Sequence, residues 1–284
     1  MLYDLHVHTT ASDGLSSPEE VIAMAVKRGL AGLAITDHDT IDGIEPARKF
    51  IEDTGISIDF IPGIELNTDY GEAEVHILGY FIDYDDLKLI DRLNYIRQER
   101  YHRAEKMVAK LQALGCNIRL EQVQQLAQGD LIGRPHIARA LCLKGYALSE
   151  PEAFGKYIAR GRPGYVPRYK FSPYEAIGLI KQSGGIAILA HPGLIRDAVI
   201  INEIIGMGIE GIEVYYPEHG SEQEFAFKRL ATEKNLLISG GSDYHGRGSG
   251  KKREQLGISG IDEDIMGRIR AYYERKISFK LNKN

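Results

Sequence analysis

The sequence predicts an α/β protein built on a parallel sheet or barrel. Short hydrophobic runs alternate with helical patterns along most of the 284-residue chain, and near-continuous hydrophobic runs are typical of parallel strands covered on both faces. One stretch, from about Asp86 to Tyr169, interrupts this alternation and contains helix patterns without a convincing strand. The repeated strand–helix order therefore indicates an α/β fold, and the interruption indicates an inserted helical subdomain.

The expected elements follow in chain order. Hydrophobic runs predict strands at 2–7, 30–36, 56–66, 74–82, 185–191, 209–216 and 236–241. Two intervening helices have start signals, because Ser17 and Ser172 are each followed by a proline and apolar spacing, with two acidic residues after the first proline. The interrupting stretch predicts helices over 86–113, 119–128, 135–144 and 150–159. We therefore expect a barrel domain, residues 1–88 and 170–284, and a helical insert, residues 89–169.

The composition excludes several classes of protein. The chain is long enough to bury a sizeable core without disulfide staples, and its two cysteines, Cys116 and Cys142, form no C-x-x-C pair. The amino terminus lacks the basic and apolar segments of a signal peptide, and no hydrophobic run approaches the roughly 20 residues that span a bilayer. We therefore expect a protein of the reducing cytoplasm, with no membrane association.

The modest net charge of −5 hides an uneven distribution. Residues 95–172 carry 14 Lys and Arg against 6 Asp and Glu, a net charge of +8, whereas the rest of the chain carries 21 against 34, a net charge of −13. A basic insert beside an acidic body suggests a site that holds cations and a flap that gathers anions. A chance bias of solvated helix faces would give the same numbers, so the charge pattern alone leaves both interpretations open.

Histidines and carboxylates gather near the ends of the predicted strands. His6 and His8 lie two residues apart, so both side chains point to one face of a strand. Six runs together supply nine candidate ligands: His6, His8, Asp13, His38, Glu65, His76, His191, Asp243 and His245. The carboxyl ends of parallel strands meet at one end of an α/β fold, and mixed His and carboxylate sets suit manganese, iron or zinc. A lone histidine near a strand end is more often packed or exposed than ligating. Nine histidines and carboxylates placed near successive strand ends, however, predict two or three divalent metal ions.

The motifs that hold these residues resemble a known family. DLHVHTTASDG, ITDHDT, GIEL, VHILGY, AHPG and GSDYH occur in the order found in the polymerase and histidinol phosphatase (PHP) superfamily of metal-dependent phosphoesterases, and they cover essentially the whole chain. The resemblance implies a distorted (β/α)7 barrel with a trinuclear site. It implies His6, His8 and Asp243 on one metal, Glu65 bridging to a second held by His76 and His191, and Asp13, His38 and His245 on a third. Asp13 stands where some relatives have histidine.

Such a centre suits hydrolysis of a phosphoester by a metal-activated hydroxide, with cations neutralising the phosphoryl oxygens. The leaving oxygen then needs a proton or a metal. His219, in VYYPEH after the sixth run, is the remaining histidine near the strand ends and is a candidate general acid. It is equally well explained as a histidine of a surface loop.

The insert contains groups that could hold a second phosphate. In LIGRPHIARAL, Gly-Arg-Pro opens a helix and places Arg134, close to His136, where helix-start N–H groups also favour anions. Further candidate substrate contacts are Arg100, His102, Arg103 and Arg160, with Arg162, Arg168 and Lys170 near them in the sequence and Tyr101, Tyr165 and Tyr169 as candidates to stack a base. Apart from Arg134, each of these is also explained as a solvated charge or a packed ring.

The insert also narrows the substrate class. GRPHIAR between the HILGY and AHPG motifs is similar to the PHP branch that includes 3′,5′-nucleoside bisphosphate phosphatases and 5′–3′ exoribonucleases of short RNA. The resemblance implies a nucleotide bisphosphate or short RNA as substrate. We expect divalent metals, with manganese favoured, and predict no protein partner. The alternatives are a histidinol-phosphate type of small-molecule phosphatase and a non-catalytic, metal-containing nucleic-acid binding protein. A small cationic amino alcohol would gain little from an insert of charge +8, and the intact ligand set argues against a protein without activity.

Overall fold

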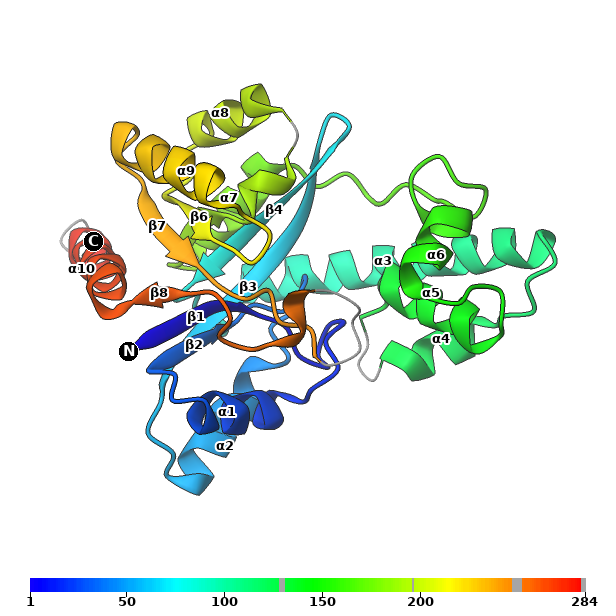
Figure 1. The fold of residues 1–284 in the computed structure, drawn as a ribbon, viewed down its shortest axis with the longest axis horizontal. Helices are drawn as coiled ribbons and strands as arrows, with labels where there is room; N and C mark the ends of the chain where they lie inside the picture. Colours follow the sequence, from blue (N-terminus) through cyan, green and yellow to red (C-terminus); the bar gives the residue numbers. More distant parts are fainter. Residues whose placement is uncertain (128–130, 196, 247–251, 282–284) are drawn as a thin grey trace.

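The computed structural model describes residues 1–127, 131–195, 197–246 and 252–281. A central sheet has helices on its outside, and a separate group of helices projects to one side of it (Figure 1). This arrangement confirms the predicted α/β barrel with an inserted helical subdomain.

Eight strands in the described residues form one sheet, in the order β7-β6-β5-β4-β3-β2-β1-β8. The strands are β1 (Leu2–Val7), β2 (Gly32–Ile35), β3 (Asp59–Tyr70), β4 (Ala73–Tyr80), β5 (Ile186–Leu189), β6 (Gly211–Tyr215), β7 (Leu237–Gly240) and β8 (Ile261–Asp262). The sheet is nearly closed, because a parallel bridge joins Val7 at the end of β1 to Tyr244 beyond β7. Seven strands overlap the predicted runs, and the short β8 is additional.

Strand β4 runs against its neighbours, which the sequence analysis did not anticipate. It pairs antiparallel with both β3 and β5, and only Gly71 and Glu72 separate it from β3, a link too short for a parallel crossover. His76 therefore lies near the amino end of its strand, not at the carboxyl end that we expected. Because the strand is reversed, that amino end lies at the same end of the barrel as the carboxyl ends of the parallel strands.

The helices outside the barrel are α1 (Pro18–Lys27), α2 (Ile44–Thr54), α7 (Pro173–Gln182), α8 (Ala198–Gly206), α9 (Ser221–Glu233) and α10 (Glu263–Leu281), with short 3₁₀ turns η2 (Pro192–Leu194) and η3 (Lys252–Glu254). The predicted start signals are used: Ser17 accepts the N–H of Glu20, Ser172 accepts the N–H of Glu175, and each glutamate bonds back to the cap N–H. Strand β5 is buried on both faces, as expected for a strand between two layers.

The insert consists of α3 (Leu87–Ala113), α4 (Leu120–Ala127), α5 (Arg134–Leu143), α6 (Glu150–Ala153) and a π-helical turn, η1 (Phe154–Ile158). These helices share a hydrophobic core of their own, which begins at Ala104. The first half of α3 packs instead into the barrel core, through Leu89, Leu93 and Ile96. The change from the barrel core to the insert core therefore lies within α3, whereas residue 88 was the predicted boundary. Residue 128, the last of a predicted helix, lies outside the described residues.

Within the described ranges, no helix combines the length and the apolar character needed to cross a membrane.

Candidate metal centre and substrate cavity

The barrel delivers all nine predicted ligands to one end of its strands. His6 lies in β1, Glu65 in β3 and His76 in β4, and the loops after β1, β2, β5 and β7 carry His8, Asp13, His38, His191, Asp243 and His245. His191 and Asp243 have positive φ angles of 25° and 51°, a region that residues with side chains rarely adopt. The surrounding contacts therefore hold strained backbone at two positions of the cluster.

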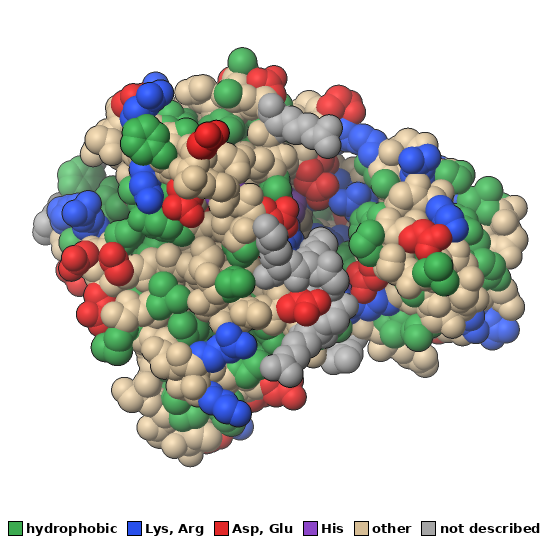
Figure 2. Space-filling view, in the orientation of Figure 1, with side chains coloured by type: hydrophobic (Ala, Val, Ile, Leu, Met, Phe, Trp, Pro, Cys, Tyr) green, Lys and Arg blue, Asp and Glu red, His purple; other side chains and the backbone are tan. Residues whose placement is uncertain are grey.

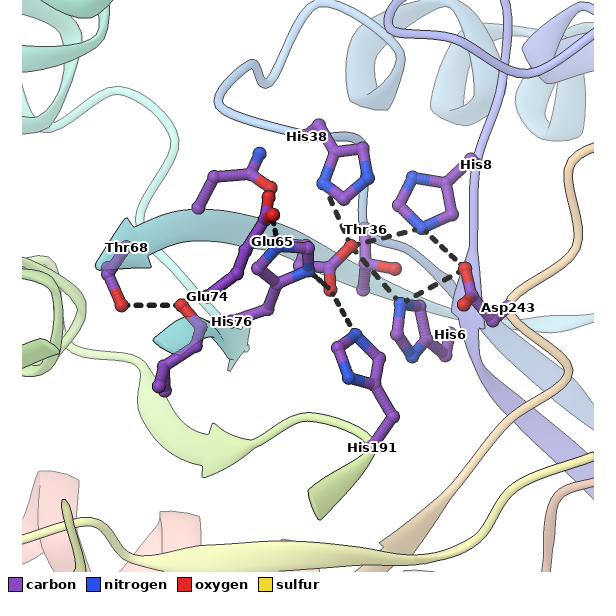
Figure 3. Close-up of polar contacts among 12 residues, drawn as sticks. His6, His8, Thr36, His38, Glu65, Thr68, Glu74, His76, His191 and Asp243 are labelled. Carbon is purple, nitrogen blue, oxygen red and sulfur yellow. Dashed lines mark hydrogen bonds and ion pairs between the residues drawn. The ribbon is translucent and has the colours of Figure 1, made fainter. Parts of the chain in front are cut away.

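Glu65 is the centre of this cluster, and the imidazoles converge on its carboxylate (Figure 3). Its Oε1 lies 2.8 Å from His76 Nδ1 and 3.1 Å from His191 Nε2. Its Oε2 lies 2.9 Å from His38 Nδ1 and 3.2 Å from the Nε2 atoms of His6 and His8. One fully buried carboxylate thus contacts five histidines from four segments of the chain.

Two aspartates extend the cluster. Asp243 Oδ1 lies 3.2 Å from His8 Nε2 and 3.3 Å from His245 Nδ1, and Asp13 Oδ1 lies 3.4 Å from His245 Nε2. The donor atoms fall into four overlapping sets, each within 4.8 Å: His8, Asp13, His38 and His245; His6, Glu65 and His191; His6, His8 and Asp243; and His38, Glu65 and His76. These sets overlap the three that the family resemblance implies, with His8 also near the third group.

The donor set fits divalent cations. Several buried ligand atoms have no hydrogen-bond partner in the described part of the chain: His6 Nε2, both ring nitrogens of His8, His38 Nδ1, Asp13 Oδ1 and Glu65 Oε2. A buried polar atom without a partner is costly. Imidazole nitrogens and carboxylate oxygens that face one another without hydrogen bonds are the ligands that manganese, iron and zinc accept.

The charges of the cluster also suit cations. Burial alone would raise the pKa of Glu65, but His38, His6 and His76 outweigh it and hold that pKa well below its usual range. Burial alone would lower the pKa of His76, but Glu65 and Glu74 outweigh it and raise the pKa to about 9. The carboxylate is therefore ionised and ready to ligate, whereas a cation at His76 has to displace a proton.

Two functional candidates escaped the sequence analysis. Glu213, in β6, is fully buried and lies 3.0 Å from His6 Nδ1. The sequence offered a signal for it, because it is the one acid inside the hydrophobic run IEVYY, and a buried charge needs a partner. Arg253 lies 2.8 Å from Asp243 Oδ2, and the Tyr216 hydroxyl donates to the same oxygen at 3.0 Å. Arg253 had no comparable signal, because it follows the last predicted strand in an irregular segment.

A cavity of about 1040 Å³ joins the metal-ligand cluster to the insert. Its barrel wall includes Asp13, His38, His76, His191 and His245, and its insert wall includes Arg100, Arg103, Arg134, Arg139, Arg160 and Arg168. Figure 2 shows acidic and basic side chains close together in the hollow between the barrel and the insert. The basic excess of the insert therefore faces the acidic cluster of the barrel.

Glu74 connects the two walls. It accepts from Arg134 Nη2 at 3.0 and 3.1 Å, lies 2.8 Å from Arg168 Nη2, and lies 3.4 Å from His76 Nε2. The sequence offered a signal for Glu74, because a residue two positions before His76 in a strand points to the same face. The carboxylate of Glu74 is therefore the anion with which two guanidinium groups and a histidine of the cavity pair.

The remaining arginines are crowded. Arg100 pairs with Asp39, and Arg160 pairs with Glu72 on the β3–β4 turn. Burial and the guanidinium groups of Arg134, Arg100 and Arg168 lower the pKa of Arg103. An anion beside Arg103 would relieve this repulsion.

The other predicted substrate contacts are not all at the cavity. His136 lines it but is buried; its Nδ1 accepts the N–H of Gly133 at 3.0 Å, and burial lowers its pKa to about 4, so it acts as a neutral helix cap. His102 is exposed on α3, 3.6 Å from Glu105, and does not line the cavity, because that face of the helix turns to solvent.

The aromatic candidates also differ. Tyr101, Tyr165 and Tyr169 do not line the large cavity, and Tyr169 packs instead against Tyr95. The apolar lining comes from other residues, which include Phe154, Leu194, Ile195 and Ile200. Helix packing, which spacing alone does not specify, decides which rings reach the cavity.

His219 occupies a structural position. Its Nδ1 lies 2.8 Å from the Val214 carbonyl, and its Nε2 accepts the N–H of Gly193 at 3.1 Å. It also packs against Tyr216 and Phe227 and does not line the cavity. Both ring nitrogens are therefore used to hold the loop after β5 against the loop after β6, which argues against a general acid.

Comparisons with known proteins agree with this site. A family model described as PHP domain matches residues 4–154. The chain is 38% identical to the 5′-3′ exoribonuclease Rnm of Escherichia coli (strain K12), over 86% of this chain and 85% of that protein. It is 36% identical to a 3′,5′-nucleoside bisphosphate phosphatase of Chromobacterium violaceum, over 87% of this chain and 88% of that protein.

A solved structure gives the same result. A crystal structure from Bifidobacterium adolescentis, described as a candidate metal-dependent phosphoesterase, superposes with a TM-score of 0.85 and 30% identity over 94% of both chains. The predicted enzyme class is therefore confirmed, and the chain belongs to the PHP family of metal-dependent phosphoesterases.

Proposed function

We propose that this chain hydrolyses nucleotide phosphoesters: phosphate is released from 3′,5′-nucleoside bisphosphates, short RNA is degraded from its 5′ end, or both. The observation that carries the proposal is the shared cavity, which has the His and carboxylate cluster on one wall and arginines on the other. A substrate with two phosphates can place one on each wall. The names of two relatives, a bisphosphate phosphatase and an exoribonuclease, describe substrates of this kind.

We propose that the cluster holds two or three divalent cations, with manganese favoured over iron or zinc. His6, His8 and Asp243 would hold one, Glu65, His76 and His191 a second, and Asp13, His38 and His245 a third. When bound, such ions supply Lewis-acid stabilisation of charge on phosphoryl oxygens and activation of water. The buried ligand atoms without hydrogen-bond partners support this assignment.

Arg134 is the proposed clamp for the second phosphate. It begins α5 and holds both oxygens of Glu74. Phosphate oxygens accept the same N–H donors as a carboxylate, and helix-start N–H groups add to the attraction. Arg100, Arg103 and Arg160 are the proposed supporting cations, whereas the positions of His102 and His219 give them no part in the proposal.

A cytoplasmic location is also proposed. Cys116 and Cys142 are both free thiols, as expected in a reducing compartment.

The test is a substrate panel after reconstitution with Mn²⁺. We expect kcat/KM for adenosine 3′,5′-bisphosphate, or for short 5′-phosphorylated RNA, to exceed that for histidinol phosphate by at least about 100-fold, because only the first two have an anion for the arginine wall. A preference for histidinol phosphate would favour the small-molecule alternative. RNA binding without turnover of any substrate would favour the non-catalytic alternative.

A further inference from the structure

We infer that Glu213 is a positioning residue that fixes His6 and His191 for cation binding. The inference deepens the proposed function and rests on it only in taking these two histidines as ligands. Glu213 is fully buried in β6 and belongs to none of the four donor sets. A buried carboxylate needs hydrogen-bond donors. The donors that face Glu213 indicate its role.

The two oxygens of Glu213 face two different ligand residues. Oε1 lies 3.0 Å from His6 Nδ1, and Oε2 accepts the backbone N–H of His191 at 2.7 Å. Glu213 thus joins a ligand on β1 to a ligand beyond β5. Glu65 also contacts both histidines, but at their Nε2 atoms, whereas Glu213 contacts the opposite ring nitrogen of His6 and the backbone of His191.

The first contact sets the ring of His6. A carboxylate oxygen accepts hydrogen bonds, and Oε1 of Glu213 faces His6 Nδ1, so an N–H at this ring nitrogen donates to Glu213. The other nitrogen, Nε2, faces the cluster, 3.2 Å from Glu65 Oε2 and 3.6 Å from Asp243 Oδ1, without a hydrogen-bond partner. A cation bound at Nε2 would leave the imidazole one proton, on Nδ1, and Glu213 lies where it accepts that proton in a hydrogen bond.

The second contact holds the backbone at His191. This residue has φ 25° and ψ 60°, a conformation unfavourable for a residue with a side chain. The bond from its N–H to Glu213 stabilises this turn, which aims His191 Nε2 at Glu65 Oε1, 3.1 Å away. Loss of one carboxylate would therefore loosen ligands on two segments at once.

Glu210 provides a matched control. It lies just before β6, and its Oε2 also accepts a backbone N–H from β5, that of Ala187 at 2.9 Å. Its Oε1 accepts from Tyr272 at 3.0 Å and from Lys276 at 2.7 Å, on α10. Glu210 therefore has the same kind of structural contacts as Glu213 but no contact with the ligand cluster.

The experiment compares Glu213→Gln with Glu210→Gln. Glutamine keeps the shape but has one acceptor oxygen, so either His6 Nδ1 or the His191 N–H loses its acceptor. We expect Glu213→Gln to bind Mn²⁺ about 10- to 100-fold more weakly than the wild type. Equilibrium dialysis with elemental analysis measures the affinity, at a temperature where thermal unfolding shows both proteins to be folded. Glu210→Gln should retain wild-type Mn²⁺ affinity. Wild-type affinity in Glu213→Gln, or an equal loss in Glu210→Gln, would overturn the inference.

A second measurement needs no variant. In the Zn²⁺-loaded wild-type protein, ¹⁵N NMR should show His6 protonated at Nδ1 and coordinated through Nε2. Coordination through Nδ1 would overturn the role of Glu213 while leaving the metal centre intact. If the wild type binds neither Mn²⁺ nor Zn²⁺, the proposed metal centre fails and the inference fails with it.

Discussion

The two walls of the cavity are built in different ways. On the barrel wall, the candidate metal ligands are mostly buried, contact one another directly, and converge on Glu65. On the insert wall, the arginines are partly exposed, and Arg134 and Arg160 are held by carboxylates of the β3–β4 hairpin rather than by the insert itself. The proposed metal centre is thus held within one sheet, whereas the proposed contacts to the second phosphate depend on how the insert docks against that sheet.

The largest expected effect is on the barrel wall. His191→Ala removes an imidazole from the Glu65 group, so we expect a loss of bound metal and a fall in kcat/KM on the order of 10³-fold or more. Metal content and phosphate release measure the two effects. His102→Ala is the control, because His102 is exposed outside the cavity. Unchanged metal content and rate in His191→Ala would refute its assignment as a ligand.

The next effect is on the insert wall. Arg134→Ala should mainly raise KM for bisphosphate substrates, with a loss of about 2–4 kcal/mol in kcat/KM, because a charge-assisted contact to the second phosphate is removed. Metal content should not change. Arg162→Ala, at an exposed arginine outside the cavity, is the matched control. Equal losses for monophosphate and bisphosphate substrates would show that Arg134 does not hold the second phosphate.

The stability of the insert should depend on pH through His136. Burial lowers the pKa of His136 from 6.5 to about 4, so protonation favours the unfolded chain. Neutral His136 contributes fully to the free energy of unfolding above pH 6.5. This contribution, about 3 kcal/mol, is lost as the pH falls towards 4. His136→Asn retains an acceptor for the Gly133 N–H and does not titrate. Urea unfolding should therefore show the wild type losing its advantage over this variant as the pH falls; a pH-independent difference would contradict the assignment.

The smallest expected effect is at His219. Because both of its ring nitrogens contact backbone groups, His219→Gln should change kcat by less than about threefold. A fall of 10²- to 10⁴-fold, the range of general acid catalysis, would restore His219 as the proton donor.

The contrast between the walls also explains what the sequence could predict. The carboxyl ends of parallel strands meet at one end of a barrel, so the positions of His6 and His191 in their runs were enough to bring them together. Glu65 joins them from within β3, which continues to Tyr70 beyond the predicted end at residue 66. The orientation of His76 depended on a two-residue link that the hydrophobic pattern did not reveal. Glu213 was visible as a lone acid in an apolar strand, but its partners depend on the strand order.

The insert was less predictable because helix packing sets its contacts. Arg134 follows a glycine and precedes a proline at a helix start, which defines its place, and the structure puts it on the cavity. His102 and Tyr101 have no such marker, and the rotation of α3 turns them away from the cavity. Arg253 reaches Asp243 from a segment without periodicity, so no pattern pointed to it.

The proposed substrate places one phosphate on each wall of the cavity. The most direct test is the ratio of kcat/KM for adenosine 3′,5′-bisphosphate to that for adenosine 3′-monophosphate, measured with the Mn²⁺-reconstituted wild type and with Arg134→Ala. We predict a wild-type ratio of about 30 to 1,000, equivalent to about 2–4 kcal/mol, that falls towards one in the variant. Equal kcat/KM values for the two substrates in the wild type would contradict the account.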